Sequence, residues 1–146
     1  MLQNQQLQTG VRRLGADWKV ALINSALVGS GGFVGALARY GISGLVHRQV
    51  PLTVFPYGTL AVNLIGCLLI GLLAGLAESR QLFGPQFRLL VLIGVLGGFT
   101  TFSTLGFETF TMLRAAEYWR ASANVGMNIV FGLTLVWIGY ELALMR

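Results

Sequence analysis

Charged residues are the scarcest class in this 146-residue sequence. They make up 10% of the chain, with 10 basic and 5 acidic residues, whereas soluble domains have about 25%. Hydrophobic residues make up 55%, and the mean hydropathy is +0.72. The length suits one domain, but the charges are too few to cover a water-soluble core. The composition therefore indicates a membrane protein.

Residues that bind metals or form disulfides are nearly missing as well. Cys67 is the single cysteine and His47 the single histidine, which excludes an intrachain disulfide, a cysteine cluster and a pair of zinc-binding histidines. The sequence also has no phosphate-binding P-loop and no recognisable nucleophile–base pair. We therefore expect no enzymatic activity. The net charge of +5 is scattered between apolar runs, which favours lipid headgroups over nucleic acid as the partner.

Long uncharged runs account for most of the chain. They are 19, 29, 19 and 20 residues long and cover 20–38, 49–77, 89–107 and 121–140. A membrane-spanning helix needs about 20 mainly apolar residues, and no period-two alternation suggests strands. We expect four transmembrane helices near 20–44, 57–77, 88–114 and 122–144. In this all-α organisation, 19–146 form the membrane domain and 1–18 a polar N-terminal extension.

The distribution of basic residues gives only a weak preference for one orientation in the membrane. With four spans, both termini share a side, and that side carries Arg12, Arg13, Lys19, Arg80, Arg88 and Arg146. The opposite side carries Arg39, Arg48, Arg114 and Arg120. A small difference permits either a single topology with the termini inside or a dual-topology protein that pairs with an inverted copy of itself. Charge alone favours the first interpretation.

Glycine and hydroxyl residues meet in the middle of the third run. Residues 97–104 read GGFTTFST, a composition that favours a break in the helix. Carbonyl groups freed by such a break must be buried or face water, and they resemble the groups that hold cations in broken transporter helices. The alternative is a continuous helix whose Ser and Thr side chains bond back to the preceding turn. Elsewhere, Gly31/Gly35, Gly71/Gly75 and Gly94/Gly98 have the spacing that lets helices approach closely.

Two pairs of polar residues lie one turn apart within the apolar runs. Thr59 and Asn63 share a face of the second helix, and Asn124 and Asn128 share a face of the fourth. Asparagine N–H groups can replace water around an anion. The alternative is that these side chains hold helices together, at about 0.6 kcal/mol per hydrogen bond. Together with the hydroxyl residues of the third run, they favour a polar track.

Three further residues have two interpretations each. Arg39 either attracts anions into a vestibule or extends to the lipid headgroups. Glu108 either pairs with a basic residue or caps the polar segment. The positive ring edge of Phe102 can stabilise a small anion without trapping it, although an isolated phenylalanine more often serves packing.

Three motifs together carry a resemblance to a known family. They are GALARY at 35–40, YGTLAVNLIG at 57–66 and GGFTTFST at 97–104. The chain resembles the CrcB/Fluc fluoride channels from about residue 29 to residue 144. The second and third motifs in combination are specific, whereas either glycine pattern alone would be weak.

The resemblance implies both a fold and a function. The fold is four helices, the third broken near 97–101, assembled as an antiparallel, dual-topology homodimer in the bilayer. The function is fluoride-selective passive export through two pores across a bacterial inner membrane. A structural Na⁺ ion would be held by the backbone carbonyl groups of Gly97 and Thr100.

The same resemblance implies the pore residues. By motif position they are Asn63, Thr59, Phe102, Ser103, Thr104 and Asn128, with Arg39 at the vestibule and Glu108 at the acidic position after the motif. One position departs from the pattern, because Leu105 stands where the family usually has a second phenylalanine. Either one fluoride site is weaker, or Phe99, Phe107 or a partner's phenylalanine takes its place.

Two other functions are compatible with four small membrane helices. A dual-topology multidrug exchanger needs a carboxylate in its first span to trade protons for cations, and residues 20–38 have none. A non-transporting assembly subunit would use the polar residues only to hold helices together. Fluoride efflux from liposomes separates a channel from both.

Overall fold

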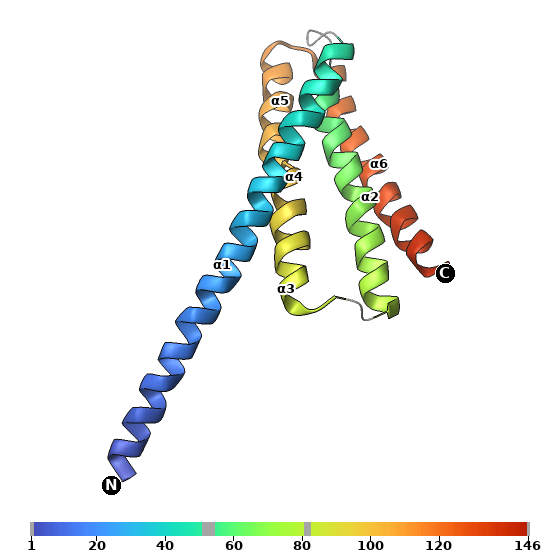
Figure 1. Cartoon of the computed structure of the whole chain (residues 1–146). Coiled ribbons are helices and arrows are strands. Elements are labelled where there is room, and N and C mark those ends of the chain that lie inside the picture. Colours follow the sequence, from blue (N-terminus) through green and yellow to red (C-terminus); the bar gives the residue numbers. More distant parts are fainter. Residues whose placement is uncertain (1, 51–54, 81–82, 146) are drawn as a thin grey trace.

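The computed structural model of the chain describes residues 2–50, 55–80 and 83–145, and every regular element among them is helical (Figure 1). The elements are α1 (Leu2–Gln49), α2 (Tyr57–Arg80), α3 (Pro85–Phe87), η1 (Arg88–Leu96), α4 (Gly97–Phe99), α5 (Phe102–Arg114) and α6 (Tyr118–Leu144). Four segments are long and apolar enough to cross a membrane: Asp17–Gln49, Tyr57–Ser79, Pro85–Arg114 and Tyr118–Leu144. The predicted all-helical membrane protein with four spans is confirmed.

Helix α1 is longer than the sequence suggested. It begins at Leu2 instead of near residue 20 and so includes the residues expected to form a separate polar extension. The reason is local, because Gln, Leu and Arg are good helix formers and no proline interrupts the run. Its 48 residues correspond to about 72 Å, more than twice the hydrocarbon thickness. Its N-terminal half projects away from the other helices (Figure 1).

Helices α2 and α6 run side by side and meet through glycine (Figure 1). A Cβ atom added to Gly71 would overlap the carbonyl oxygen of Val136, and one added to Gly139 would overlap that of Leu68. The absence of a side chain therefore lets the two backbones touch. The contact between α1 and the third span is similar, because a Cβ atom on Gly35 would overlap the carbonyl oxygen of Val95.

The third span is assembled from four short helical elements. Pro85 occupies the first turn of α3, where its missing N–H is not needed. The nine residues of η1 form a π-helix, a wider turn than the α-helix. Thr100 (φ −81°, ψ 156°) and Thr101 (φ −149°, ψ 113°) then have extended backbone between α4 and α5. The Thr100 N–H still bonds to the Leu96 carbonyl at 3.0 Å, so the helical hydrogen bonds stop at the Thr101 N–H, which bonds to a side chain instead.

Candidate ion pathway

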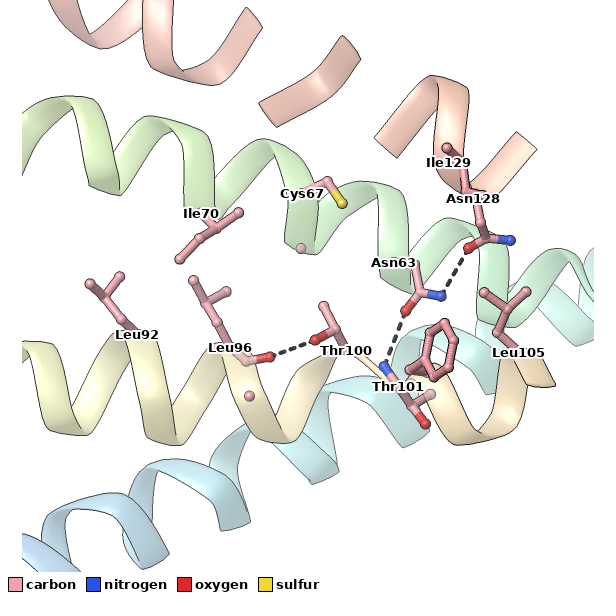
Figure 2. Close-up of a pocket in the computed structure, with 13 residues that line it drawn as sticks. Asn63, Cys67, Ile70, Leu92, Leu96, Thr100, Thr101, Leu105, Asn128 and Ile129 are labelled. Carbon is pink, nitrogen blue, oxygen red and sulfur yellow. Dashed lines mark hydrogen bonds between the residues drawn. The ribbon is translucent and has the colours of Figure 1, made fainter. Parts of the chain in front are cut away.

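A pocket of about 450 Å³ opens beside the interruption in the third span. It lies between α2, α6 and the third span (Figure 2). Its walls are mainly apolar, and its polar groups come from Asn63, Asn128, Thr100 and Thr101, with the thiol of Cys67. A mostly apolar cavity with a few converging polar groups is the usual form of a small-ligand site.

Asn63 joins the three elements around this pocket. It projects from α2, and its Oδ1 accepts a hydrogen bond from the backbone N–H of Thr101 at 3.1 Å. Its Nδ2 donates to Oδ1 of Asn128 on α6 at 2.9 Å (Figure 2). The Thr101 N–H makes no helical hydrogen bond to a backbone carbonyl, so the Asn63 side chain gives this donor a partner that it would otherwise lack. The structure therefore brings two predicted pore residues, Asn63 and Asn128, together at the helix interruption.

The hydrogen bonding continues from Asn128 into the protein interior. Asn128 Nδ2 donates to the carbonyl oxygen of Asn124 at 2.9 Å and lies 3.4 Å from its Oδ1. Asn124 is completely buried, and its Nδ2 donates to Oγ1 of Thr109 at 3.0 Å. Thr109 in turn donates to the carbonyl oxygen of Leu105 at 2.8 Å. The sequence signalled Asn124 by its spacing from Asn128, but nothing in it indicated Thr109.

Thr59 and Glu108 form a second polar contact. Thr59 is 7% exposed, and its hydroxyl donates to Oε1 of Glu108 at 2.6 Å. Among the side chains that the structure describes, those of 17–50, 55–79 and 83–145, Glu108 Oε2 is the one buried oxygen or nitrogen without a hydrogen-bond partner. Of the two interpretations of Glu108, pairing with a basic residue is not seen among the described residues: its hydrogen-bond partner is the Thr59 hydroxyl group, because α5 turns this carboxylate toward α2.

Hydroxyl groups gather where α5 begins. Thr101 is the residue before the helix, and its Oγ1 accepts a hydrogen bond from the backbone N–H of Thr104 at 3.3 Å. The same oxygen lies 3.2 Å from Ser103 Oγ and 3.0 Å from Thr104 Oγ1. A threonine at this position satisfies a helix N–H that has no carbonyl partner. The cap explains why helix α5 restarts so soon after the interruption.

Gly97 and Thr100, the residues proposed to hold a cation, both line the pocket. In a continuous helix, the Thr101 N–H would bond to the Gly97 carbonyl, but it bonds to Asn63 instead. The Thr100 hydroxyl bonds back to the carbonyl oxygen of Leu96 at 3.1 Å. No group of three His, Cys, Asp or Glu side chains that could hold a metal occurs among the described residues. The available ligands are backbone oxygens, which suit an alkali cation.

The two positions of the aromatic motif have different surroundings. Phe102 lines the pocket yet is 85% exposed, and Leu105, one turn later, is 8% exposed and also lines it. Phe99 is buried at 4% exposure and Phe107 is 71% exposed, and neither is among the residues that line the pocket. Phe102 is therefore the one aromatic side chain among the described residues that line the pocket, and Leu105 adds an aliphatic side chain one turn later.

Arg39 is not part of this pocket. It lies half-buried on α1, and the pocket walls come from α2, α6 and the third span. Gly35, one helical turn before Arg39, is the residue of this part of α1 that packs against Val95. Of the predicted pore side chains, Asn63, Phe102 and Asn128 line the pocket. Ser103 and Thr104 do not line it and contact the Thr101 hydroxyl instead, and Thr59 lies apart with Glu108.

Comparison with known proteins gives a consistent result. The model of a family described as "CrcB-like protein, Camphor Resistance (CrcB)" matches residues 26–140. The curated protein "Fluoride-specific ion channel FluC" of Methylobacillus flagellatus is 47% identical over 119 residues, which are 82% of this chain and 93% of that protein. The protein of the same name from Geobacter sp. strain M21 is 48% identical over 122 residues, 84% of this chain and 95% of that protein. "Fluoride-specific ion channel FluC 1" of Methanosarcina acetivorans is 40% identical over 113 residues, with 77% and 85% covered.

The matched region begins within α1 and ends within α6, so it contains parts of all four spans and the whole pocket. It also contains the three motifs at 35–40, 57–66 and 97–104. The resemblance inferred from these motifs is therefore confirmed, and the chain belongs to the CrcB-like family.

Proposed function

We propose that this protein is a fluoride channel that exports cytoplasmic fluoride passively across a bacterial inner membrane. The observation that carries the proposal is the Asn63 amide, held between Thr101 and Asn128 beside a pocket at membrane depth. Polar groups in a membrane-spanning segment are costly and usually serve a pathway. The relatives named as fluoride-specific channels supply the identity of the ion.

The polar lining suits a small, strongly hydrated anion. An amide nitrogen carries two protons, and Asn63 uses one of them for Asn128, which leaves one for fluoride. The ring edge of Phe102, which lines the pocket, supplies a further weak donor, and in our proposal the nearby hydroxyl groups of Ser103 and Thr104 contact the ion where it leaves the pocket. Weak, repeated contacts let an ion leave as readily as it enters. None of these groups carries a positive charge that would trap the anion.

Export needs no chemical energy source in this proposal. Hydrogen fluoride enters acid-stressed cells as a neutral molecule and dissociates at the higher internal pH. A membrane potential that is negative inside then drives the anion out with about 2.3 kcal/mol per charge for each 100 mV. A passive pore is sufficient for this task.

The pathway is completed by a second copy of the chain in our proposal. Phe102 lines the pocket and is 85% exposed in the single chain, and a pocket wall left this open would admit lipid. An antiparallel partner closes it and creates two equivalent pores. The weak charge bias between the two sides of the membrane is compatible with insertion in both orientations. In this assembly, Arg39 would attract anions at the vestibule.

A structural Na⁺ ion fits the same assembly. The carbonyl oxygens of Gly97 and Thr100 would hold it, since the first lacks its helical donor and the second lies in extended backbone. The ion would supply positive charge between two interrupted helices. Replacing sodium with N-methylglucamine should lower the dimer's thermal stability, whereas an unchanged unfolding temperature would contradict the cation site.

The decisive experiment is fluoride efflux, measured with a fluoride electrode, from liposomes that contain only this protein. We expect rapid fluoride loss on shunting the membrane potential with valinomycin, and no comparable loss of chloride. Absence of efflux from a properly assembled dimer would favour a non-transporting subunit. Proton-coupled uptake of organic cations would favour a multidrug exchanger. Cysteine crosslinking between protomers separately tests the antiparallel arrangement.

A further inference from the structure

We infer that Thr109 and Asn124 are positioning residues that fix the orientation of the Asn63 amide in the pathway. The inference rests on the proposed function, because it concerns which end of that amide an anion meets. Neither residue lines the pocket, so each acts through another side chain. The two residues join Asn63 and Asn128 in one chain of hydrogen bonds, which we call the amide chain.

The two ends of the amide chain are backbone groups of fixed chemistry. One end is the N–H of Thr101, which donates to Asn63 and cannot accept. The other end is the carbonyl of Leu105, which accepts from Thr109 and cannot donate. Both groups are close in sequence and belong to the interruption and the first turns of α5. A chain with a donor at one end and an acceptor at the other permits only one direction.

Thr109 sets this direction at the inner end. Its hydroxyl has one proton, and that proton goes to the Leu105 carbonyl at 2.8 Å. The oxygen is then an acceptor toward Asn124 Nδ2 at 3.0 Å. The Asn124 Oδ1 therefore faces Asn128 and accepts from its Nδ2 at 3.4 Å, beside the Asn124 backbone carbonyl, which accepts from the same nitrogen at 2.9 Å. The Oδ1 of Asn128 then faces Asn63, and the Nδ2 of Asn63 donates to this oxygen.

Burial makes the direction difficult to reverse. Asn124 has no exposed surface, so water cannot replace a lost partner there. If one of the three amides turned over, a donor would face a donor and an acceptor would face an acceptor. If all three turned together, Asn63 would present N–H to the Thr101 N–H, and Asn124 would present its oxygen to a hydroxyl already committed to Leu105. The present orientation is the one that satisfies every group.

The orientation matters for an anion because the two ends of an amide have opposite polarity. In the observed orientation, the Asn63 oxygen accepts from the Thr101 N–H, and one of its two amide protons is not used by Asn128. In the reverse orientation, carbonyl lone pairs would occupy that place and repel fluoride. Thr109 and Asn124 therefore act together with the Thr101 N–H and the Asn124 carbonyl to hold Asn63 in the orientation that attracts the ion.

The test removes the Thr109 hydroxyl without changing the side-chain shape. We expect Thr109→Val to lower fluoride efflux about fivefold, the factor for one ordinary hydrogen bond, and to lower the fluoride-to-chloride permeability ratio. Thr109→Ser, which keeps the hydroxyl, should restore both. Thr111→Val is the matched control, because Thr111 on the same helix makes the same bond to the carbonyl four residues earlier, at 2.9 Å, and is outside the amide chain.

A second comparison separates orientation from packing. Asn124→Leu should impair efflux more than Thr109→Val, and the double variant should be no worse than Asn124→Leu alone, because both act on one chain. If Thr109→Val does not assemble, Thr109→Ala carries the same prediction. Wild-type efflux and selectivity in the Thr109 variant, equal loss in Thr109→Ser, or additive effects in the double variant would each overturn the inference. A wild-type protein that conducts no fluoride would instead overturn the proposed function.

Discussion

The two halves of the α2–α6 pair differ in how closely the helices pack. In one half, Gly71 and Gly139 bring the backbones together so closely that no side chain fits between them. In the other half, Asn63 and Asn128 face each other beside a pocket of about 450 Å³. The α2–α6 pair therefore has a closed half, where glycine lets the backbones touch, and an open half, where two asparagine side chains lie between the helices beside the pocket. The closed half fixes the angle at which the open half can present its amides.

The largest effect is expected where the open half loses its central amide. Asn63→Leu keeps the approximate volume but leaves the Thr101 N–H and Asn128 Oδ1 without partners. We expect fluoride efflux to fall about a hundredfold, the factor for leaving two polar groups without partners at about 1.4 kcal/mol each. The variant should still elute from size-exclusion chromatography at the wild-type volume, since the glycine contacts are unchanged. Thr134→Val, which alters an exposed hydroxyl on α6, should keep wild-type efflux.

A change in the closed half should affect stability before transport. A methyl group at Gly71 would overlap the Val136 carbonyl, a backbone atom that cannot rotate away. We expect Gly71→Ala to lower the free energy of unfolding by about 3 kcal/mol, measured by thermal unfolding in detergent. Gly126→Ala on α6 has open space within 4 Å and should be neutral or slightly stabilising. Equal behaviour of the two variants would show that glycine contact does not hold this half closed.

Thr59 tests whether the polar contacts of the open half also contribute to stability. Thr59→Val would leave the Glu108 carboxylate without the hydroxyl that donates to it at 2.6 Å. We expect a loss of about 2 kcal/mol of unfolding free energy, because a second carboxylate oxygen there already lacks a partner. Thr59→Ser should recover most of it. Similar unfolding temperatures for the valine and serine variants would mean that the hydrogen bond contributes little.

The smallest effect is expected at Leu105, where the pocket wall departs from the family pattern. Leu105→Phe would place a ring on the wall of a cavity large enough to accept it, so efflux should equal or exceed the wild-type rate. Phe102→Leu, which removes the one ring at the pocket, should lower efflux instead. Loss of the dimer in Leu105→Phe would show that this side chain lies against protein and not against the pathway.

The sequence predicted the features that depend on one segment at a time. Uncharged runs fixed the four spans, because hydrocarbon thickness sets helix length. The motif at 57–66 identified Asn63, and the spacing of Asn124 and Asn128 placed them on one face. These predictions need no knowledge of how helices sit against one another.

Features that depend on the register between helices were not predictable in this way. In the sequence, nothing distinguishes Thr109 from other threonines in apolar helices. Its role becomes visible only in the structure, where Nδ2 of Asn124 on α6 lies 3.0 Å from its Oγ1. Glu108 meets Thr59 only because α5 restarts after an extended pair of residues. The long continuation of α1 was missed for a different reason: polar residues can extend a helix beyond the bilayer, and composition marks only where the apolar part ends.

The π-helix η1 has a consequence for how this chain tolerates insertion and deletion. A π-turn holds one residue more than an α-turn, and each residue added to or removed from a helix rotates everything beyond it by about 100°. Deleting one residue within Arg88–Leu96 would therefore let this segment relax toward a regular α-helix and largely keep the direction of Phe102 and Leu105. The same deletion within Gly97–Phe99, which is α-helical, would rotate both side chains away from Asn63. The nine residues of η1 therefore set how the following helix is rotated relative to Asn63, although only Leu92 and Leu96 of them line the pocket.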